Sequence, residues 1–170
     1  METTRTRTAS VAQNGPAGHD RSLFPALAAV CARAEPYFYA LLRAAFGLIM
    51  LTHGLPKLMG ASHGSMADPM AGSINLIQNV MGLPFAPQLA FLVMLLESVG
   101  AVMLAVGLWT RLVALLIVAE MAAISYALGP TWPWIDRGIE YPVLMAFLAL
   151  YMAVRGSGPM AVERRLGWAI

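Results

Sequence analysis

The sequence predicts an all-α membrane protein, an antiparallel bundle of four transmembrane helices with a short amphipathic helix in the first outer loop. Composition is the first reason, because 59% of the 170 residues are hydrophobic, only 12% are charged, and the mean hydropathy is +0.67. A soluble domain has about 25% charged residues, so we expect lipid to cover this surface. Several long apolar runs and an uneven distribution of Lys and Arg are the other two reasons.

The apolar runs predict where the chain crosses the membrane, since about 20 helical residues span a hydrocarbon core of ~30 Å. Pro36 suits the first turn of the first span, and the GLWTR turn makes the second and third spans antiparallel neighbours. The last run is short, so we expect Glu140 and Arg155 to mark its two ends. The predicted spans are residues 37–59, 88–108, 111–128 and 140–154.

The regions on either side of the membrane domain are predicted to be cytoplasmic. Residues 1–36 read as a tail, which is disordered over 1–20 and then forms an interfacial helix over 22–34. The membrane domain follows over residues 37–158. Residues 159–170 are a short C-terminal tail.

The connections between the spans predict the topology. Residues 73–82 are expected to form the amphipathic helix, and Trp132 and Trp134 suit an interfacial aromatic belt. One side of the membrane carries most of the cations: Arg5, Arg7, Arg21, Arg33, Arg111, Arg155, Arg164 and Arg165. The other side carries Lys57 and Arg137. The positive-inside rule therefore predicts that both termini are cytoplasmic.

The sequence also argues against several classes of function. A single cysteine, Cys31, excludes an internal disulfide or a CxxC redox centre. The formal charge of +2 gives no nucleic-acid patch, and we find no nucleotide loop, zinc spacing or nucleophile elbow. No metal site is predicted: His63, Met66 and Met70 are soft ligands for Cu(I), but the methionines mostly suit packing.

Ionisable residues inside the predicted spans are the unusual feature of this sequence. An unpaired charge at the bilayer centre costs at least about 2.5–3.5 kcal/mol, so we expect these groups to face inward and to pair. Arg43, Gly47, Gly54 and Lys57 share one side of the first span, with His53 adjacent. The ionisable groups are Arg43, His53, Lys57, Glu97, Glu120 and Glu140.

Small residues on the same faces predict close packing between helices. Gly47 and Gly54 would let another helix approach the first span. Glu97 shares its side of the second span with Gly100 and Ala101, followed by Leu104 and Gly107. Both stripes are therefore expected to face other helices rather than lipid.

Depth along the helices predicts which groups meet, at 1.5 Å per residue. Glu97 and Glu120 lie near the midplane, and the long side chain of Arg43 reaches toward them from the cytoplasmic side. His53 and Lys57 lie in the outer half, and Glu140 is at a similar level. We expect an inner cluster of Arg43, Glu97 and Glu120 and an outer cluster of His53, Lys57 and Glu140.

A structural role competes with a functional one for each of these groups. Buried pairs sometimes only fix helix register, and snorkelling accounts for Lys57 and Glu140 near the interfaces. For Arg43, His53 and Glu97 we favour function, because three costly groups facing one interior exceed what register requires. For Glu120 both interpretations stay open.

Two stretches, RAAFGLIMLTHGLPKLMG and the run from GLPFAPQ to AEMAAI, resemble the DoxX family of small bacterial membrane proteins with four helices. The resemblance covers about residues 37–158. The matching residues are Arg43, His53, Gly54, Lys57, Gly82, Leu83, Pro84, Glu97, Gly100, Gly107, Leu108, Thr110, Arg111 and Glu140. The chain departs from the family near its end, where Ala161, Val162 and Glu163 replace a Ser-Leu-Asp sequence.

The resemblance implies a component of redox metabolism in the bacterial cytoplasmic membrane. Family members include a subunit of a thiosulfate:quinone oxidoreductase, and others are linked to oxidative-stress complexes with a sulfurtransferase and superoxide dismutase. It therefore implies quinone as the cofactor and soluble redox or sulfurtransferase-type proteins as partners. Association with the bilayer follows from composition, and a homo-oligomer stays open.

Three functions remain open on this evidence. The first is an oxidoreductase subunit that binds quinone between its helices and takes electrons from a partner or a bound substrate, because the chain has no electron source of its own. The second is a non-catalytic anchor for soluble redox enzymes, and the third is a small proton-coupled transporter. For the first function, the expected catalytic groups are Glu97, His53 and Arg43, and the expected quinone-binding groups are His53, Lys57, Glu120 and Glu140.

Overall fold

The computed structural model describes residues 23–168, apart from the side chain of Trp134. Within these residues the regular elements are helices, which agrees with the predicted all-α class. Three helices are long and apolar enough to cross a membrane: α1 (Pro25–Met59), the continuous helix Ala86–Val106, and α5 (Thr110–Leu128). The disorder predicted for residues 1–20 lies outside the described residues.

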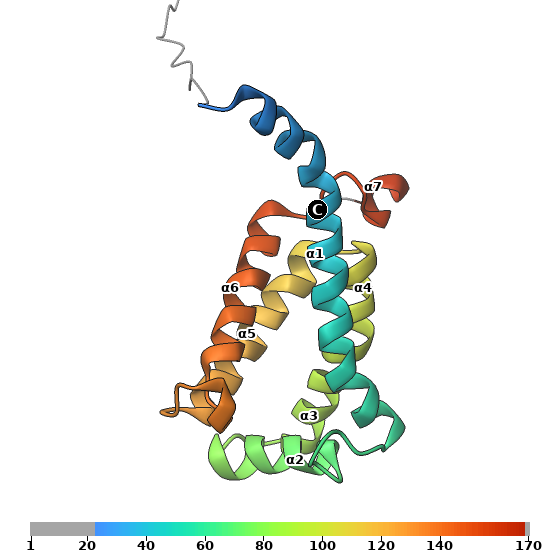
Figure 1. Cartoon of the computed structure of the whole chain (residues 1–170). Helices are drawn as coiled ribbons and strands as arrows, with labels where there is room; N and C mark the ends of the chain where they lie inside the picture. The colour runs from blue at the N-terminus through green and yellow to red at the C-terminus, as the bar shows by residue number, and fades with distance from the viewer. Residues whose placement is uncertain (1–22, 169–170) are drawn as a thin grey trace, which may run out of the picture.

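Helix α1 is a single helix of 35 residues, longer than the predicted span. Pro25 occupies the first turn, where its missing N–H costs nothing, and Gly60 ends the helix with a φ of 64°. The expected boundary at Pro36 is not a helix end, because Pro36 and Pro56 both lie inside α1. A proline removes one backbone hydrogen bond, and the turns on either side of Pro36 continue the helix. The first turns of α1 lean away from the other helices (Figure 1).

The second apolar helix contains an irregular turn. It consists of α3 (Ala86–Leu95), a π-helical turn η2 (Leu96–Gly100) and α4 (Ala101–Val106). Gly107 then closes the helix with a φ of 77°, and α5 begins at Thr110, within a residue of its predicted start. Single π-helical turns inside α-helices occur often at functional sites, and this one contains Glu97.

The remaining elements are the helix α6 (Glu140–Arg155), which packs along α5, and short helices at the two ends of the long ones. In the first connection, α2 (Pro69–Asn75) continues into the π-helical turn η1 (Leu76–Val80), close to the helix predicted over residues 73–82. The Asp68 carboxylate caps α2 by accepting the Ala71 N–H at 2.9 Å. The chain ends with η3 (Trp134–Asp136), α6 and α7 (Val162–Leu166).

The long helices pack as two closely associated pairs. Helix α1 packs along α4 and η2, while α5 and α6 lie side by side (Figure 1). The start of α1, the turn between α4 and α5, and α7 lie at one end of the molecule, and α2 lies across the other end (Figure 1). We call these the termini end and the α2 end.

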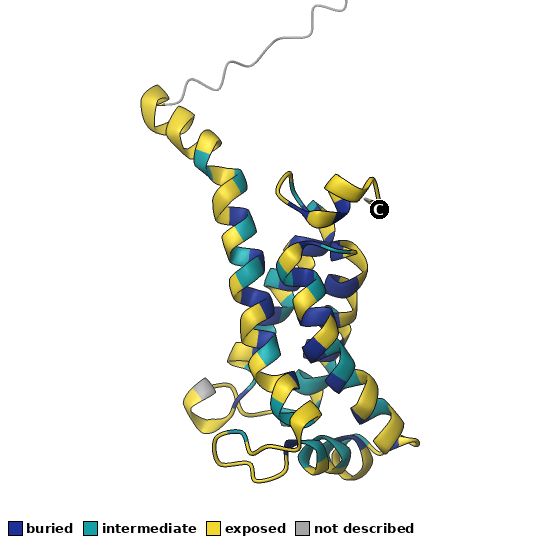
Figure 2. Cartoon of the chain, turned by 90° about the vertical axis from the view of Figure 1, so that its right-hand side faces the viewer, coloured by how far each residue is buried: buried dark blue, intermediate teal, exposed yellow. Residues whose placement is uncertain are grey.

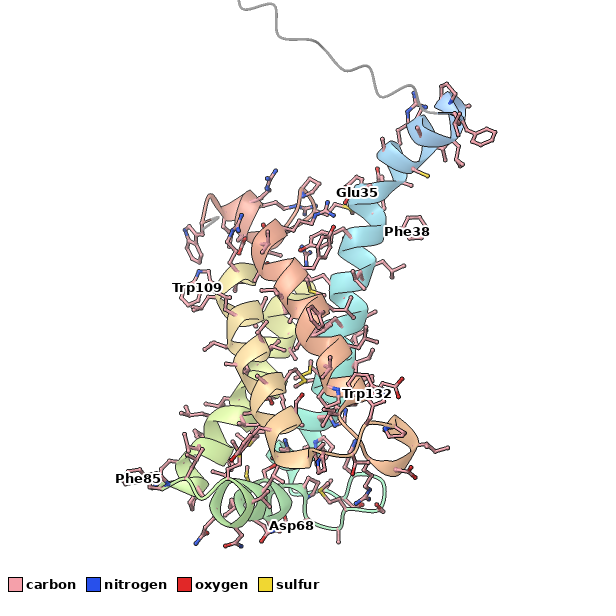
Figure 3. The ribbon with its side chains drawn as sticks, turned by 90° about the vertical axis from the view of Figure 1, so that its left-hand side faces the viewer. Glu35, Phe38, Asp68, Phe85, Trp109 and Trp132 are labelled. Atoms are coloured by element: carbon pink, nitrogen blue, oxygen red, sulfur yellow. The ribbon has the colours of Figure 1, made fainter. Side chains whose placement is uncertain are left out.

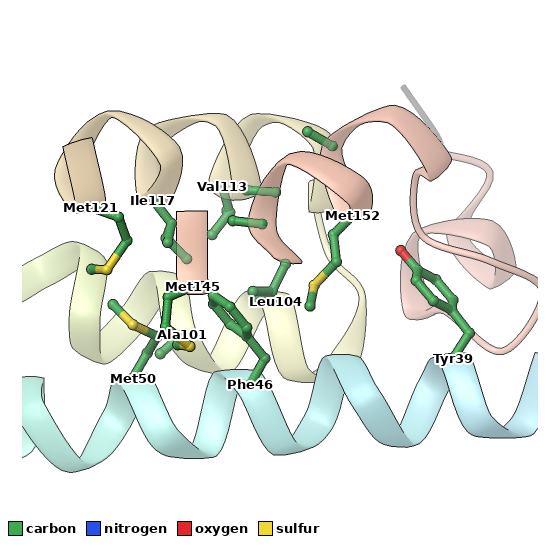
Figure 4. Close-up of a cluster of buried hydrophobic side chains, with 13 residues drawn as sticks. Tyr39, Phe46, Met50, Ala101, Leu104, Val113, Ile117, Met121, Met145 and Met152 are labelled. Carbon is green, nitrogen blue, oxygen red and sulfur yellow. The ribbon is translucent and has the colours of Figure 1, made fainter. Parts of the chain in front are cut away.

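Methionine and small side chains fill the space between the pairs. Met50 and Phe46 of α1 meet Leu104 of α4, Ile117 of α5 and Met145 of α6 in one apolar cluster (Figure 4). The buried positions face this interior, and the outer faces of the helices carry exposed residues (Figure 2). Many of those exposed residues are Leu, Phe and Val, as expected for a surface in lipid.

Glycine permits the contact between α1 and the second apolar helix, as predicted. A Cβ atom on Gly47 would lie 2.5 Å from the carbonyl oxygen of Ala101, and one on Gly54 would lie 2.4 Å from the carbonyl carbon of Glu97. The two backbones therefore touch at both positions. This contact fixes the level of α1 against η2 and α4, and so decides which polar side chains meet.

Candidate functional site

Lys57 and Glu97 form a buried ion pair near the α2 end. The Nζ atom of Lys57 lies 2.5 Å from Oε2 of Glu97, and the two side chains are only 10% and 5% exposed. Gly54 sets this contact, because it holds α1 against the backbone of Glu97, one helical turn before Lys57. The π-helical turn η2 carries Glu97 and the buried Ser98.

Glu120 of α5 places a second carboxyl group beside this pair. It is 7% exposed, and among residues 23–168 no hydrogen-bond donor faces either of its carboxyl oxygens. Its electrostatic neighbours are Glu97, whose carboxyl lies within hydrogen-bonding reach, and Lys57. A buried polar group without a partner is costly. Binding of a proton or of a ligand that donates a hydrogen bond would remove this cost for Glu120.

Two histidines connect this interior to the α2 end. The rings of His53 on α1 and His63 in the following loop lie 4.9 Å apart between centroids, at 61°. His53 also interacts electrostatically with Glu97 and Lys57. Reciprocal backbone bonds between His63 and Met66, at 2.9 and 3.0 Å, hold the loop in place. From the sequence, His63 was considered only as a copper ligand and was not placed beside His53, because its loop lies outside the spans, where helical periodicity carries no information.

We call His53, Lys57, Glu97, Glu120 and His63 the polar cluster. It combines a cation, two carboxyl groups and two imidazoles, so it can donate hydrogen bonds, hold negative charge and exchange protons. Among residues 23–168, no group of three or more His, Cys, Asp and Glu side chains is arranged to hold a metal ion. The donors, acceptors and titratable groups of the polar cluster favour proton and hydrogen-bond chemistry.

Arg43 lies in a different place from the predicted inner cluster. Its guanidinium donates to the carbonyl of Ser157 and, at 3.5 Å, to that of Ala105, and it is 2% exposed. The expected pairing with Glu97 or Glu120 is not formed. Ala105 follows Glu97 by eight residues, about 12 Å along a helix, so packing beside Ala105 puts Arg43 too near the termini end.

The segment after α6 folds back over Arg43 and closes the termini end. The Tyr39 hydroxyl donates to the carbonyl of Gly156 at 2.5 Å, and the Glu163 carboxylate accepts the Thr110 N–H at 3.1 Å. Glu163 is 1% exposed and also interacts electrostatically with Arg43. Tyr39 lies four residues before Arg43 on the same helical face. This spacing was the sequence signal that could have predicted a shared contact of the two side chains with the segment after α6.

Glu140 belongs to a surface groove rather than to the ion pair of Lys57. It begins α6, where its N–H donates to the Trp132 carbonyl at 3.1 Å. Its side chain lines an open groove with Trp132, Tyr141, Leu144 and Phe147, among others. The carboxylate bound to Lys57 is Glu97, because η2 packs directly against α1. Trp132 and Trp109 lie near opposite ends of the helices (Figure 3).

Comparison with known proteins agrees with the resemblance seen in the sequence. The model of the DoxX family matches residues 38–129, which run from within α1 to the end of α5 and contain all five residues of the polar cluster. The chain belongs to the DoxX family. With its apolar helices, this membership makes it a multi-pass membrane protein. Four members of the polar cluster come from the three helices that are long enough to span.

Two relatives match most of this DoxX protein. An uncharacterized protein of Haemophilus influenzae is 28% identical, with 77% of this chain and 92% of the relative covered. A Bacillus subtilis protein named "Putative oxidoreductase CatD" is 27% identical, with 72% of this chain and 82% of the relative covered. No solved structure matches. The second name points to redox chemistry without specifying a substrate.

Proposed function

We propose that this DoxX-family protein is an inner-membrane redox subunit and that its polar cluster binds a quinone. The observation that carries the proposal is the buried group of Lys57, Glu97 and Glu120 on helices that are apolar enough to span a membrane. Such groups are costly in lipid and are commonly functional. The name of the Bacillus subtilis relative supports redox chemistry.

The residues of the polar cluster fit the chemistry of a quinone. A quinone offers carbonyl acceptors, and Lys57 and His53 are donors. The buried Glu120 oxygens have no partner as acceptors, so a protonated Glu120 is a third donor. His53 is exposed beside Ile49 and Leu55, which are both 41% exposed on the lipid side of α1. A lipid-soluble ligand therefore has access to this side of the cluster.

Each member of the polar cluster has a distinct task in this proposal. His53 and Lys57 would hold the quinone by hydrogen bonds, and the charge of Lys57 offsets negative charge at the site. Glu97 and Glu120 hold and transfer protons. When bound, quinone would supply the capacity to accept two electrons and two protons. Arg43 lies beside the Ser157 carbonyl and Glu140 lies in the surface groove, so we give neither of them a role in holding the quinone.

The proposal extends to topology and partners. We infer that α6 is a fourth span, antiparallel to α5, and that the termini end with Arg111, Arg155, Arg164 and Arg165 faces the cytoplasm. The electrons would come from a soluble redox or sulfurtransferase-type partner, because the chain carries no electron source of its own. The exposed termini end would be the docking side for that partner.

Quinone binding by the full chain in mild detergent tests the proposal. Co-purified quinone would be extracted and counted, and added ubiquinone or menaquinone would be titrated by tryptophan quenching. We expect stoichiometric binding that weakens at least tenfold in His53→Ala and in Glu97→Gln. Thr52→Ala is the matched control, since the Thr52 hydroxyl donates only to the nearby Ile49 carbonyl at 2.7 Å among described contacts.

Two results would contradict this assignment. Absence of binding by well-folded wild-type protein would favour an anchor for soluble redox enzymes, which capture of defined partners would then identify. Equal binding by wild type, His53→Ala and Glu97→Gln would place any quinone elsewhere on the protein. A proton flux in quinone-free liposomes that Glu97→Gln abolishes would favour a transporter.

A further inference from the structure

We propose that Glu97 and Glu120 share one proton and that this proton exchanges with water at the α2 end through His53 and His63. The inference names the proton site of the function proposed above and so deepens it. It depends on the geometry of the polar cluster and not on a bound quinone. It can therefore be tested in protein that holds no quinone.

The unpartnered oxygens of Glu120 are the first observation. A carboxylate accepts hydrogen bonds and cannot donate one, so neither of two facing carboxylates can donate a hydrogen bond to the other. Neither Glu120 oxygen has a donor as long as both groups are ionised. The Glu97 carboxyl lies within hydrogen-bonding reach of the Glu120 carboxyl. One proton on Glu120 turns this repulsive contact into an O–H···O hydrogen bond and satisfies the buried group.

The charge balance inside the helices is the second observation. The charged groups that act on Glu120 are Glu97 of η2 and Lys57 of α1. Lys57 is bound to Glu97, which leaves the charge of Glu120 without a cation of its own. From α6, which packs against α5, the neighbouring core residues include the apolar Met145 and Ala149. One shared proton makes the sum of Lys57, Glu97 and Glu120 zero.

The histidines supply the route for exchange. His53 interacts with Glu97, and its ring meets that of His63 in the loop before α2. In the outward step, the carboxyl O–H bond breaks and an N–H bond forms on His53. His53 then passes its proton to His63 or to water, and the carboxyl pair is left with both groups ionised beside Lys57. The inward step reverses each of these bonds.

Infrared spectroscopy of the purified full chain, freed of quinone, tests the shared proton. The carbonyl stretch of a protonated carboxylic acid lies apart from carboxylate bands and shifts in D₂O. We expect this band at neutral pH in the wild type, its loss in Glu120→Gln, and its retention in Glu140→Gln. Glutamine keeps the shape of the side chain, and a thermal melt would verify that each variant is folded.

The rate of deuterium exchange tests the route. After mixing with D₂O, the band should shift at least tenfold more slowly in His53→Phe and in His63→Phe than in wild type or Thr52→Ala. A wild-type protein without the band, or a band that survives in folded Glu120→Gln, would overturn the shared proton. A band that exchanges at the wild-type rate in His53→Phe and in His63→Phe would overturn the route. None of these results depends on whether quinone binds.

Discussion

At the scale of single residues, Lys57 and Glu97 depend on each other. Removing one member of a buried ion pair leaves the other charge uncompensated, at a cost of about 3–5 kcal/mol. We expect Lys57→Met or Glu97→Met to lower the free energy of unfolding in detergent by about that much. The double variant should recover most of the loss, because it leaves neither charge behind. A denaturant titration of the four proteins measures the coupling; simple addition of the two losses would contradict the pairing.

Glu163 makes a smaller contribution to stability at the termini end. Its carboxylate accepts the first N–H of α5 and lies near the guanidinium of Arg43. Hydrogen bonds to a charged group contribute about 1.5–3 kcal/mol, so Glu163→Ala should destabilise the protein by about that amount. Its neighbour Arg164 is exposed, and Arg164→Ala serves as the control. An equally small effect of both changes would mean that the tail does not close this end.

At the scale of elements, the contact between α1 and η2 governs the polar cluster. A Cβ atom at position 54 would overlap the carbonyl carbon of Glu97, and overpacking of this kind typically costs about 1–3 kcal/mol. We expect Gly54→Ala to lower the melting temperature and to weaken quinone binding, because the shifted helix separates Lys57 from Glu97. Thr52→Ala on the exposed side of the same helix should do neither. Wild-type stability in Gly54→Ala would contradict the close approach.

Helix packing also explains which parts of the site the sequence could predict. Helical periodicity was sufficient to place Gly47, Gly54 and Lys57 on one packed face. It could not give the level at which two helices meet, since this depends on the backbone contact of Gly54 with Glu97 and on the extra residue in η2. The depth of Glu97 relative to α1 was wrong by a few residues, and this was enough to predict an ion pair with Arg43 instead of the observed pair with Lys57.

At the scale of the whole molecule, the two ends have different chemistry. The termini end carries a closed network of Arg43, Tyr39 and Glu163 that ties the last segment to α1 and α5. The α2 end carries the histidines and the polar cluster. Composition predicted the membrane class because it is a property of the entire chain. Closure by residues 156–167 was not predictable, since their short, polar sequence has no periodicity that would locate a partner.

The difference between the ends gives a prediction about orientation. Cys31 is exposed on the first turns of α1, at the termini end, and the orientation proposed above puts that end in the cytoplasm. A membrane-impermeant maleimide should therefore label Cys31 in inverted vesicles and leave it unlabelled in intact spheroplasts. In a Cys31→Ser background, Ala61→Cys in the exposed loop after α1 should show the opposite pattern. If the maleimide labelled Cys31 but not Ala61→Cys in intact spheroplasts, the orientation would be opposite to the proposed one. The proton route would then open to the cytoplasm.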